Sequence, residues 1–222
     1  MSSTRVLDIG QAILAKNQGL ADELRREFKQ KGILVINVVS SPGAGKTELL
    51  ARTLERISKR VATGVIVGDL ATDNDAKRMA ERGAPVLQVN TDGYCHLEAN
   101  MIRAAVDRLG ASDLRLLIIE NVGNLVCPSS HDLGEDLRVV LFSVPEGEDK
   151  PLKYPTIFKT AQLVVVSKID LGEATGFRRE EALRNIREVA PQAQIIETSA
   201  RTGAGLDEWC DLLVASATAK SK

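Results

Sequence analysis

The chain of 222 residues has little of what several common classes of protein require. Aromatic residues make up only 3% of it, too few for the stacking surface that binds single-stranded nucleic acid. No apolar run approaches the roughly 20 residues that span a membrane, and the first residues do not read as a signal peptide. The formal net charge of −1 gives no general attraction to nucleic acid or to an anionic membrane. We therefore expect a cytoplasmic protein with neither nucleic acid nor membrane as a partner.

Cysteine and histidine are also scarce, with three of the first and two of the second. An odd and sparse set of cysteines is not a disulfide framework, so their positions carry more information than their number. Cys210 stands beside Trp209 and is interpreted as a core residue, and His131 is interpreted as solvated in a polar loop. The residues left for chemistry are Cys95, His96 and Cys127.

The segment from Ser40 to Thr47 reads SSPGAGKT; it follows an apolar run and opens a helical pattern. A polyphosphate requires inward-pointing backbone N–H groups, glycines for close approach, a lysine for charge and a hydroxyl for Mg²⁺. An accidental glycine-rich turn is the alternative, and Ser40 stands where the usual pattern has a glycine. The order of the parts predicts a nucleotide site formed by Gly43, Ala44, Gly45, Lys46, Thr47 and Glu48, with Lys46 also acting in hydrolysis.

Apolar runs alternate with helical patterns along the rest of the chain. Runs of Val, Ile and Leu without strict polar alternation are typical of strands covered on both faces, and their alternation with helices favours a parallel sheet. We predict strands over residues 33–39, 63–67, 86–89, 114–119, 163–166 and 194–197, and helices over 47–60, 73–82, 94–109, 179–189 and 205–217. The expected fold is a three-layer, doubly wound α/β P-loop NTPase, a single domain over residues 1–222. An amphipathic N-terminal helix lies within residues 1–30, and residues 219–222 form a frayed tail.

A carboxylate, Glu120, ends the predicted strand over residues 114–119, and Gly123 follows it closely. Mg²⁺ bound to phosphate takes hard oxygen ligands, so we predict Thr47 and Glu120 as its ligands and the Gly123 N–H as a γ-phosphate contact with a catalytic role. An ordinary surface glutamate is the alternative. Asp69 and Asp75 follow another strand, and either can complete the metal shell or orient the attacking water. The sequence does not decide between them; our assignment gives Asp69 to Mg²⁺ and Asp75 to the water.

Lys168 and Asp170 follow the buried run over residues 163–166. A carboxylate accepts both the N1–H and the exocyclic amine of guanine, and adenine offers no such pair of donors. The Lys168 stem can lie along the base plane. Ser199 and Ala200 follow the last strand, where the Ala200 N–H can reach the guanine O6. A chance Lys-x-Asp is the alternative, but the combination predicts guanine, and hence GTP and GDP, as the nucleotides.

Cys95 and His96 are predicted at the start of a helix, and Cys127 lies four residues beyond Gly123. Thiolate and imidazole are ligands for Zn²⁺ and Ni²⁺. Three ligands do not close a site, so water or a second chain across a two-fold interface would complete it. Cysteine is also among the most buried residues, and two core thiols beside a histidine are the alternative.

These segments together resemble the HypB family, the nickel-insertion GTPases of [NiFe]-hydrogenase maturation. The most specific part is the run ENVGNLVCP from Glu120 to Pro128. The resemblance implies a dimerising class of P-loop NTPase that binds Ni²⁺ or Zn²⁺ through Cys95, His96 and Cys127. It also implies two partners, a HypA-type metallochaperone and the precursor of the hydrogenase large subunit. The chain departs from the pattern in two ways: residues 1–40 contain no Cys or His, and Ser167 stands where GTPases usually have Asn.

The predicted function is that of a GTP-hydrolysing metallochaperone whose metal site is linked to the nucleotide and lies at the interface of a GTP-dependent homodimer. Hydrolysis is expected to be slow, because no Gln or Arg finger is evident in the chain. Two alternatives remain open: a urease-type nickel accessory GTPase and a metal-binding adaptor with negligible turnover. A small-molecule kinase is disfavoured by Asp170, which selects against adenine.

Overall fold

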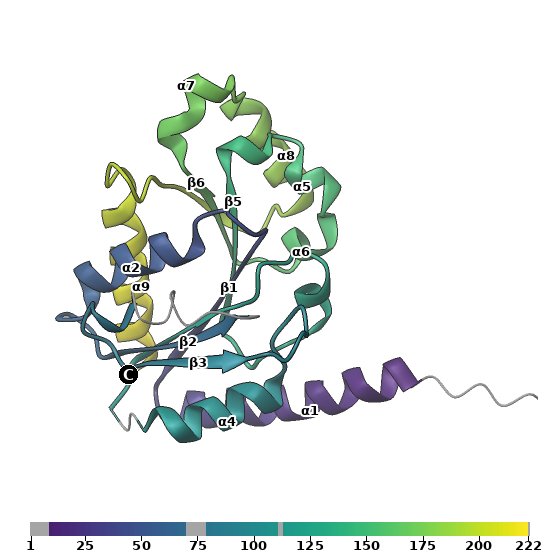
Figure 1. Cartoon of the computed structure of the whole chain (residues 1–222), viewed down its shortest axis with the longest axis vertical. Helices are drawn as coiled ribbons and strands as arrows, with labels where there is room; N and C mark the ends of the chain where they lie inside the picture. The colour runs from purple at the N-terminus through teal and green to yellow at the C-terminus, as the bar shows by residue number, and fades with distance from the viewer. Residues whose placement is uncertain (1–8, 70–78, 111–112, 222) are drawn as a thin grey trace, which may run out of the picture.

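The structure is a computed structural model, and it describes residues 9–69, 79–110 and 113–221. Its centre is a sheet of seven parallel strands in the order β3-β2-β4-β1-β5-β6-β7 (Figure 1). The strands are β1 (Leu34–Ser40), β2 (Thr63–Asp69), β3 (Val86–Asn90), β4 (Leu116–Glu120), β5 (Leu137–Ser143), β6 (Leu163–Ser167) and β7 (Gln194–Glu197). The predicted parallel α/β sheet is confirmed.

Helices cover both faces of the sheet and make the three layers that the sequence predicts (Figure 1). One face packs against α2 (Lys46–Ile57) and α9 (Leu206–Lys220). The other packs against α1 (Ile9–Gln30), α4 (Ala99–Leu109), α6 (Pro155–Lys159) and α8 (Arg179–Val189). Shorter elements are α5 (Lys150–Lys153), α7 (Gly172–Thr175), η1 (Cys127–Ser130), η2 (Val144–Glu146) and η3 (Ile169–Leu171). No helix in the described ranges is long and apolar enough to cross a bilayer.

The apolar side chains of each strand divide between the two faces, because successive residues of a strand point to opposite sides. On β1, Ile36 and Val38 join the core under α2 and α9, whereas Val35 packs with α1 and α4. A strand with cores on both sides favours apolar residues at most positions, and the polar exception inside β1, Asn37, is buried with its amide bonded to Glu135 and Asn121. In the core under α2 and α9, the Trp209 Nε1–H donates to Thr53 Oγ1 at 2.8 Å, so the indole is buried with its polar atom satisfied.

Strand β5 was not predicted, although it lies directly beside β1. The run of Val, Leu and Phe over residues 139–142 was available as a signal and was overlooked, and the strand begins one residue before the charged Arg138. The guanidinium is nonetheless buried, and it pairs with the buried Glu135 carboxylate at 2.7 Å. Burial of a charge is tolerated because the opposite charge and hydrogen bonds accompany it.

Two further predictions need correction, one on a helix and one on the C-terminal tail. The helix expected over residues 94–109 begins only at Ala99. The helix expected over 73–82 lies largely outside the described residues, so it stays a prediction. The tail expected to fray over 219–222 instead continues α9 through Lys220. Its end is anchored, because the Lys220 ammonium bonds the Asp136 carboxylate and the Ser221 hydroxyl donates to the Gly32 carbonyl at 3.3 Å. Lys222 lies outside the described residues.

Candidate nucleotide and metal sites

A cavity of about 450 Å³ lies at the carboxyl ends of the central strands, between the β1–α2 loop and the segment after β4. Gly43 and Gly45 have φ angles of 74° and 98°, the left-handed conformation that glycine adopts without strain. Gly45 is also the N-cap of α2, so the N-terminal end of that helix faces the cavity. Backbone N–H groups and the helix dipole make such a position suited to phosphate. The cavity is lined by Pro42, Gly43, Gly45, Lys46, Thr47, Glu48, Val67, Gly68, Glu120, Asn121, Val122, Gly123 and Lys168.

Ser40, the departure from the usual phosphate-loop pattern, has a defined contact. Its hydroxyl accepts a hydrogen bond from Lys46 Nζ at 2.9 Å and donates to the Ser41 carbonyl at 2.6 Å. Lys46 is buried, and this contact places its ammonium at the floor of the loop. The serine at this position therefore orients the lysine that is predicted to bind phosphate.

Two of the three residues predicted as ligands of Mg²⁺, Thr47 and Glu120, lie together. The Thr47 hydroxyl donates to Glu120 Oε1 at 2.7 Å, and the Glu120 side chain is buried at the end of β4. A hydroxyl and a carboxylate are hard oxygen donors, so this pair fits Mg²⁺. Asp69 ends β2 next to Asn90 of β3 in the sheet register, whereas Asp75 lies outside the described residues.

Gly123 brings the segment after β4 against the phosphate loop. A Cβ atom at this position would lie 3.1 Å from Pro42 Cα, so any larger residue would push the two segments apart. Gly123 lines the same cavity as Lys46 and Thr47. Its contact with the γ-phosphate through the backbone N–H stays a prediction.

A second cavity of about 230 Å³ shares Gly45, Glu48 and Lys168 with the first. Its wall contains Asp170 and Ala200, both predicted as base-binding residues. The Ser199 hydroxyl donates to Asp170 Oδ1 at 2.5 Å and lowers the pKa of that carboxyl, with further help from Arg201 at 2.8 Å. The carboxylate is thus held charged and fixed in place.

Lys168 and Ser167 join the second cavity to the phosphate loop. Lys168 has a positive φ of 59°, and its ammonium donates to the Gly43 carbonyl at 2.7 Å. The Ser167 hydroxyl donates to the Ala44 carbonyl at 2.7 Å, so the serine keeps a tie to the loop at the position where GTPases usually have Asn. Arg201 was not predicted, although it directly follows Ala200, because no local pattern marks it as a partner of Asp170.

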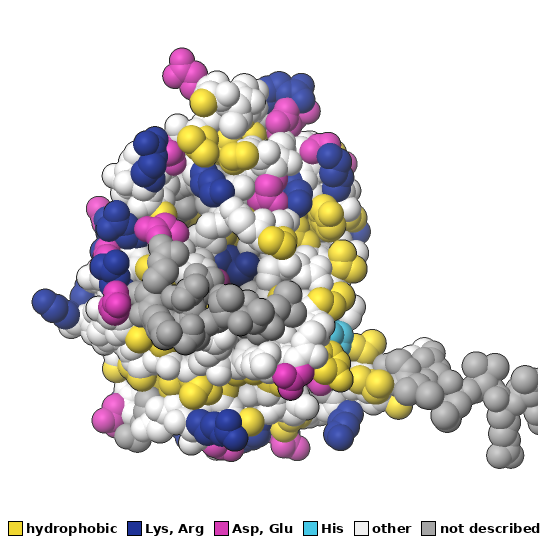
Figure 2. Space-filling model, viewed as in Figure 1, with side chains coloured by type: hydrophobic (Ala, Val, Ile, Leu, Met, Phe, Trp, Pro, Cys, Tyr) yellow, Lys and Arg dark blue, Asp and Glu magenta, His cyan; other side chains and the backbone are white. Residues whose placement is uncertain are grey.

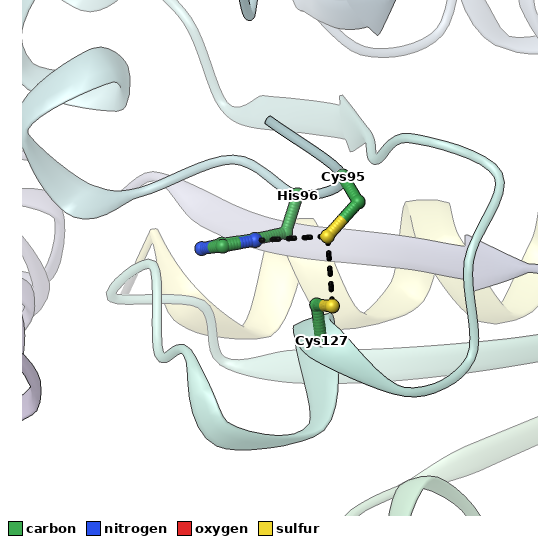
Figure 3. Close-up of side chains that lie close together, drawn as sticks. All are labelled: Cys95, His96 and Cys127. Atoms are coloured by element: carbon green, nitrogen blue, oxygen red, sulfur yellow. Dashed lines mark hydrogen bonds between the residues drawn. The ribbon is translucent and has the colours of Figure 1, made fainter. Parts of the chain in front are cut away.

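Cys95, His96 and Cys127 converge at a separate place, as predicted (Figure 3). The Cys95 and Cys127 sulfurs lie 2.7 Å apart, and His96 Nδ1 is 3.7 Å from the Cys95 sulfur. The local structure differs from the prediction in one respect: Cys95 and His96 lie in the loop after β3, before α4 begins at Ala99. Cys127 is the first residue of η1.

The surroundings of Cys95 and His96 favour the neutral forms of these two side chains. The hydrogen bond to Cys127 raises the pKa of the Cys95 thiol. Burial lowers the pKa of His96, and the neighbouring His131 lowers it further. A neutral imidazole offers a lone pair to a metal, and a thiol gives up its proton as the metal binds.

His131 is not the solvated residue that the sequence analysis expected. It is half-buried, and its ring lies 3.8 Å from the His96 ring, centroid to centroid, with a tilt of 36°. Its Nδ1 lies 3.0 Å from the Cys127 carbonyl oxygen. Cys210, in contrast, is the core residue expected, and burial raises the pKa of its thiol to about 11.

Two asparagines join the segment after β4 to the loop that carries Cys95 and His96. Asn121 Oδ1 accepts from the Leu97 N–H at 3.1 Å, and Asn124 Nδ2 donates to the Cys95 carbonyl at 3.2 Å. Sequence reasoning missed both, although they stand inside the run that it singled out. The segment that lines the phosphate cavity therefore also holds the backbone beside the sulfur.

Helix α1 holds the same region from the other side through Asn17. Its Oδ1 accepts from the Ala99 N–H at 2.8 Å, and its Nδ2 donates to the Asp132 carbonyl at 2.8 Å. Ala99 follows the Cys95–His96 loop, and Asp132 follows His131. One side chain thus fixes the spacing of the two loops.

The surface around the cluster is apolar. Tyr94 and Val126, the neighbours of the two cysteines in sequence, are 54% and 61% exposed. Figure 2 shows a histidine among hydrophobic side chains at the edge of the visible face, while Lys and Arg are interspersed with Asp and Glu over the rest. Exposed apolar residues beside metal-ligand types are suited to contact with another protein surface.

The fold and the phosphate loop define a P-loop nucleotide-binding protein. The family described as CobW/HypB/UreG, nucleotide-binding domain, matches residues 34–197. The hydrogenase maturation factor HypB of Escherichia coli K12 is 48% identical over 213 residues, covering 96% of this chain and 73% of that protein. The hydrogenase/urease maturation factor HypB of Helicobacter pylori is 41% identical over 216 residues, covering 96% and 88%. The chain belongs to the CobW/HypB/UreG family, and its relatives are HypB proteins.

Solved structures give the same result. HypB from Archaeoglobus fulgidus superposes with a TM-score of 0.86 at 40% identity, covering 91% of this chain and 99% of that one. HypB from Helicobacter pylori, in complex with nickel, superposes with a TM-score of 0.87 at 40% identity, covering 93% and 97%. The signal recognition particle receptor FtsY from Elizabethkingia anophelis, at 16% identity and a TM-score of 0.56, shares the fold alone.

Proposed function

We propose that this protein is a GTP-hydrolysing metallochaperone that carries Ni²⁺ or Zn²⁺ at a nucleotide-linked site and supports nickel insertion into the [NiFe]-hydrogenase large subunit. One observation carries the proposal. The segment from Glu120 to Cys127 begins in the phosphate cavity and ends at a sulfur, and Asn124 within it bonds the Cys95 backbone. A shift of this segment would move a metal ligand.

The nucleotide chemistry rests on the residues of the first cavity. Lys46 would neutralise phosphate charge, and the backbone of the loop from Gly43 to Gly45 would cradle the phosphates. Thr47 and Glu120 would hold Mg²⁺, which shields the charge that develops on the transferred phosphoryl group. Gly123 would offer its N–H to the γ-phosphate. The roles of Asp69 in the metal shell and Asp75 at the attacking water belong to the same proposal.

Guanine would occupy the second cavity. The charged Asp170, held by Ser199 and Arg201, would accept both donors of the guanine edge. The Lys168 stem would lie along the base, and the Ala200 N–H would reach its O6. GTP rather than ATP follows, because adenine offers no matching pair of donors.

The metal would be cargo, held by the Cys95 and Cys127 sulfurs and His96. Three ligands leave a position for water or for a second copy of the chain, and the exposed Tyr94 and Val126 beside them would pack in a GTP-dependent homodimer. The nickel complex of the 40% identical Helicobacter pylori HypB supports this cargo. A HypA-type metallochaperone and the large-subunit precursor are the proposed partners.

The experiment is a titration of wild type and Cys127→Ala with Ni²⁺ and with Zn²⁺, each in GDP and in a non-hydrolysable GTP analogue, followed by sizing. We expect the nucleotide to change metal affinity and metal to change nucleotide affinity by the same factor, as linkage requires. Cys127→Ala should lose both effects. Equal metal affinity in the two nucleotide states would overturn the coupling.

Turnover is tested separately, by release of phosphate from GTP in wild type and in Lys46→Ala. We expect a slow rate in the wild type and none above background in the variant. Equal rates would mean that the nucleotide site is only a regulator of a metal-binding adaptor.

A further inference from the structure

We propose a second metal position beside the thiolate pair, formed by His96, Glu98 and His131, which takes Ni²⁺ or Zn²⁺ on nitrogen and oxygen ligands. The inference rests on the proposed function, because it extends the same cargo site. One ligand atom from each of the three residues lies within 4.8 Å of the others. Two of them come from the loop before α4 and the third from the loop after η1.

The hydrogen bond of His131 sets the nitrogen that can bind a metal. Its Nδ1 lies 3.0 Å from the Cys127 carbonyl, and a carbonyl can only accept. In the neutral ring Nδ1 therefore carries the proton, and Nε2 keeps a lone pair. Histidine ligands in metal proteins are commonly oriented in this way, by donating the other N–H to a backbone carbonyl or carboxylate.

The Nε2 atom of His96 provides a second, independent observation that points to a metal ion at this position. This atom is buried and has no hydrogen-bond partner within the described residues, while Glu98 Oε1 lies 3.7 Å away. A lone pair facing a carboxylate is repulsive, and a buried N–H without a partner is costly. A cation between the nitrogen and the carboxylate would satisfy both groups.

The two positions share His96 and differ in ligand type. The ring presents Nδ1 toward the Cys95 sulfur and Nε2 toward Glu98, and its face lies against the His131 ring. A neutral imidazole has one lone pair, so it serves one position at a time. The chain thus holds one ion at a time, either at the softer position with the two sulfurs or at the harder position with nitrogen and oxygen ligands. An ion that leaves the sulfurs would move to the nitrogen and oxygen position before it leaves the protein.

The loops are preorganised for this arrangement. Asn17 bonds the backbone of Ala99 and of Asp132, the residues that directly follow Glu98 and His131. Little conformational freedom is lost when an ion joins loops already held at this spacing.

The test uses Co²⁺, because thiolate ligands give it a charge-transfer band in the near ultraviolet that nitrogen and oxygen ligands do not. Wild type should bind one equivalent with that band. Cys95→Ser/Cys127→Ser should still bind one equivalent, without the band. In this double variant, adding His131→Phe, which keeps the stacked ring but removes the donors, should weaken Co²⁺ at least ten-fold. Adding Glu98→Gln should do the same.

The controls separate this idea from its alternatives. Asp92→Asn, which removes an exposed carboxylate of the same loop, should leave Co²⁺ affinity in the double variant unchanged. In wild type, His131→Phe should leave the thiolate band intact. Circular dichroism checks folding, and wild type with its exposed thiols capped by methyl methanethiosulfonate provides the sulfur-blocked site without substitution.

The inference is overturned if the double variant and the capped protein bind Co²⁺ no tighter than the double variant carrying His131→Phe. A missing thiolate band in wild type, in contrast, would count against the proposed thiolate cargo site. The two failures therefore give different results.

Discussion

The cavity around Lys46 and Thr47 and the cluster of Cys95, His96 and Cys127 are built in opposite ways. The first lies on buried strand ends and a helix N-terminus, where Lys46 and Glu120 are buried and Thr47 is fixed to Glu120 at 2.7 Å. The second lies on two loops, with Cys95 exposed and Cys127 half-buried. A nucleotide site of this kind is rigid before its ligand binds, whereas ligands on loops can separate at small cost.

The difference suggests a division of labour. A transition state requires groups held in place, and the sheet supplies them. A cargo ion must be released, and loops joined by a few hydrogen bonds allow that. The only described side-chain bonds from the segment 120–127 to the loop carrying Cys95 and His96 are those of Asn121, Asn124 and Cys127. Substitutions in one region should thus leave the other working, except at these bonds.

The largest effect is expected for Lys46→Ala. Removal of the ammonium leaves phosphate charge unshielded, and GTP hydrolysis should fall by roughly 100-fold or more. Metal affinity without nucleotide should stay as in wild type, because Lys46 bonds Ser40 and not the cluster. Phosphate release and a Ni²⁺ titration on the same preparation make the comparison. A parallel loss of both would mean that the two regions are not separate.

Asp170→Asn should change the base that is bound. The amide loses one of the two acceptors for guanine and gains a donor, which suits the C2 carbonyl of xanthine. We expect GTP affinity to fall by roughly 100-fold, the scale of a lost charged hydrogen bond plus an unpaired donor, and xanthosine triphosphate to bind in its place. Competition between the two nucleotides measures the switch. Asp149→Asn, an exposed carboxylate elsewhere, is the control.

Asn124→Ala should loosen the connection between the regions without removing a ligand of either. It deletes the bond to the Cys95 carbonyl, worth about 1 kcal/mol, so the factor by which nucleotide changes metal affinity should fall by roughly 5-fold. Metal affinity in GDP is expected to change less than this factor. An unchanged factor, measured by the titrations proposed above, would place the coupling elsewhere.

The smallest effect concerns the third cysteine. Burial raises the pKa of Cys210 to about 11, above the value of about 8.5 of an unfolded thiol. A folded-state pKa above the unfolded value gives stability that is complete below pH 8.5 and is lost as pH rises toward 11. The advantage of wild type over Cys210→Ala in urea unfolding should therefore shrink across this interval, while metal binding at pH 7.5 stays the same. A constant difference would contradict the burial of the thiol.

Most of the sheet could be predicted from sequence, because its strands carry continuous apolar runs. Strand β5 was missed although residues 139–142 form an uninterrupted apolar run; what the sequence does not show is that Arg138 is buried, because its partner Glu135 meets it only in the fold. The start of α4 was placed too early for a similar reason. The loop over Tyr94, Cys95 and His96 fits a helical pattern, but Asn17, remote in sequence, bonds the N–H of the first helical residue.

The prediction of the candidate sites had the same limit: contacts between segments distant in sequence could not be predicted. Residues inside a local motif, such as Lys46, Thr47 and Cys127, could be proposed from spacing alone, and the structure places them in the cavity or the cluster where that proposal needs them. Residues that act by contact across the fold were missed. Arg201 meets Asp170, and His131 meets His96, only after distant segments have packed together. Local sequence patterns carry no information on such pairs.

Asn17 has a practical consequence for anyone who shortens this protein. Helix α1 contains no Cys or His and invites removal as a dispensable extension. The side-chain amide of Asn17 nonetheless bonds the backbone of two loops that are distant in sequence. A protein without this helix would lack these bonds, so its two loops would no longer be held at the same spacing. Metal dissociation constants measured on such a truncated protein would therefore not apply to the intact chain.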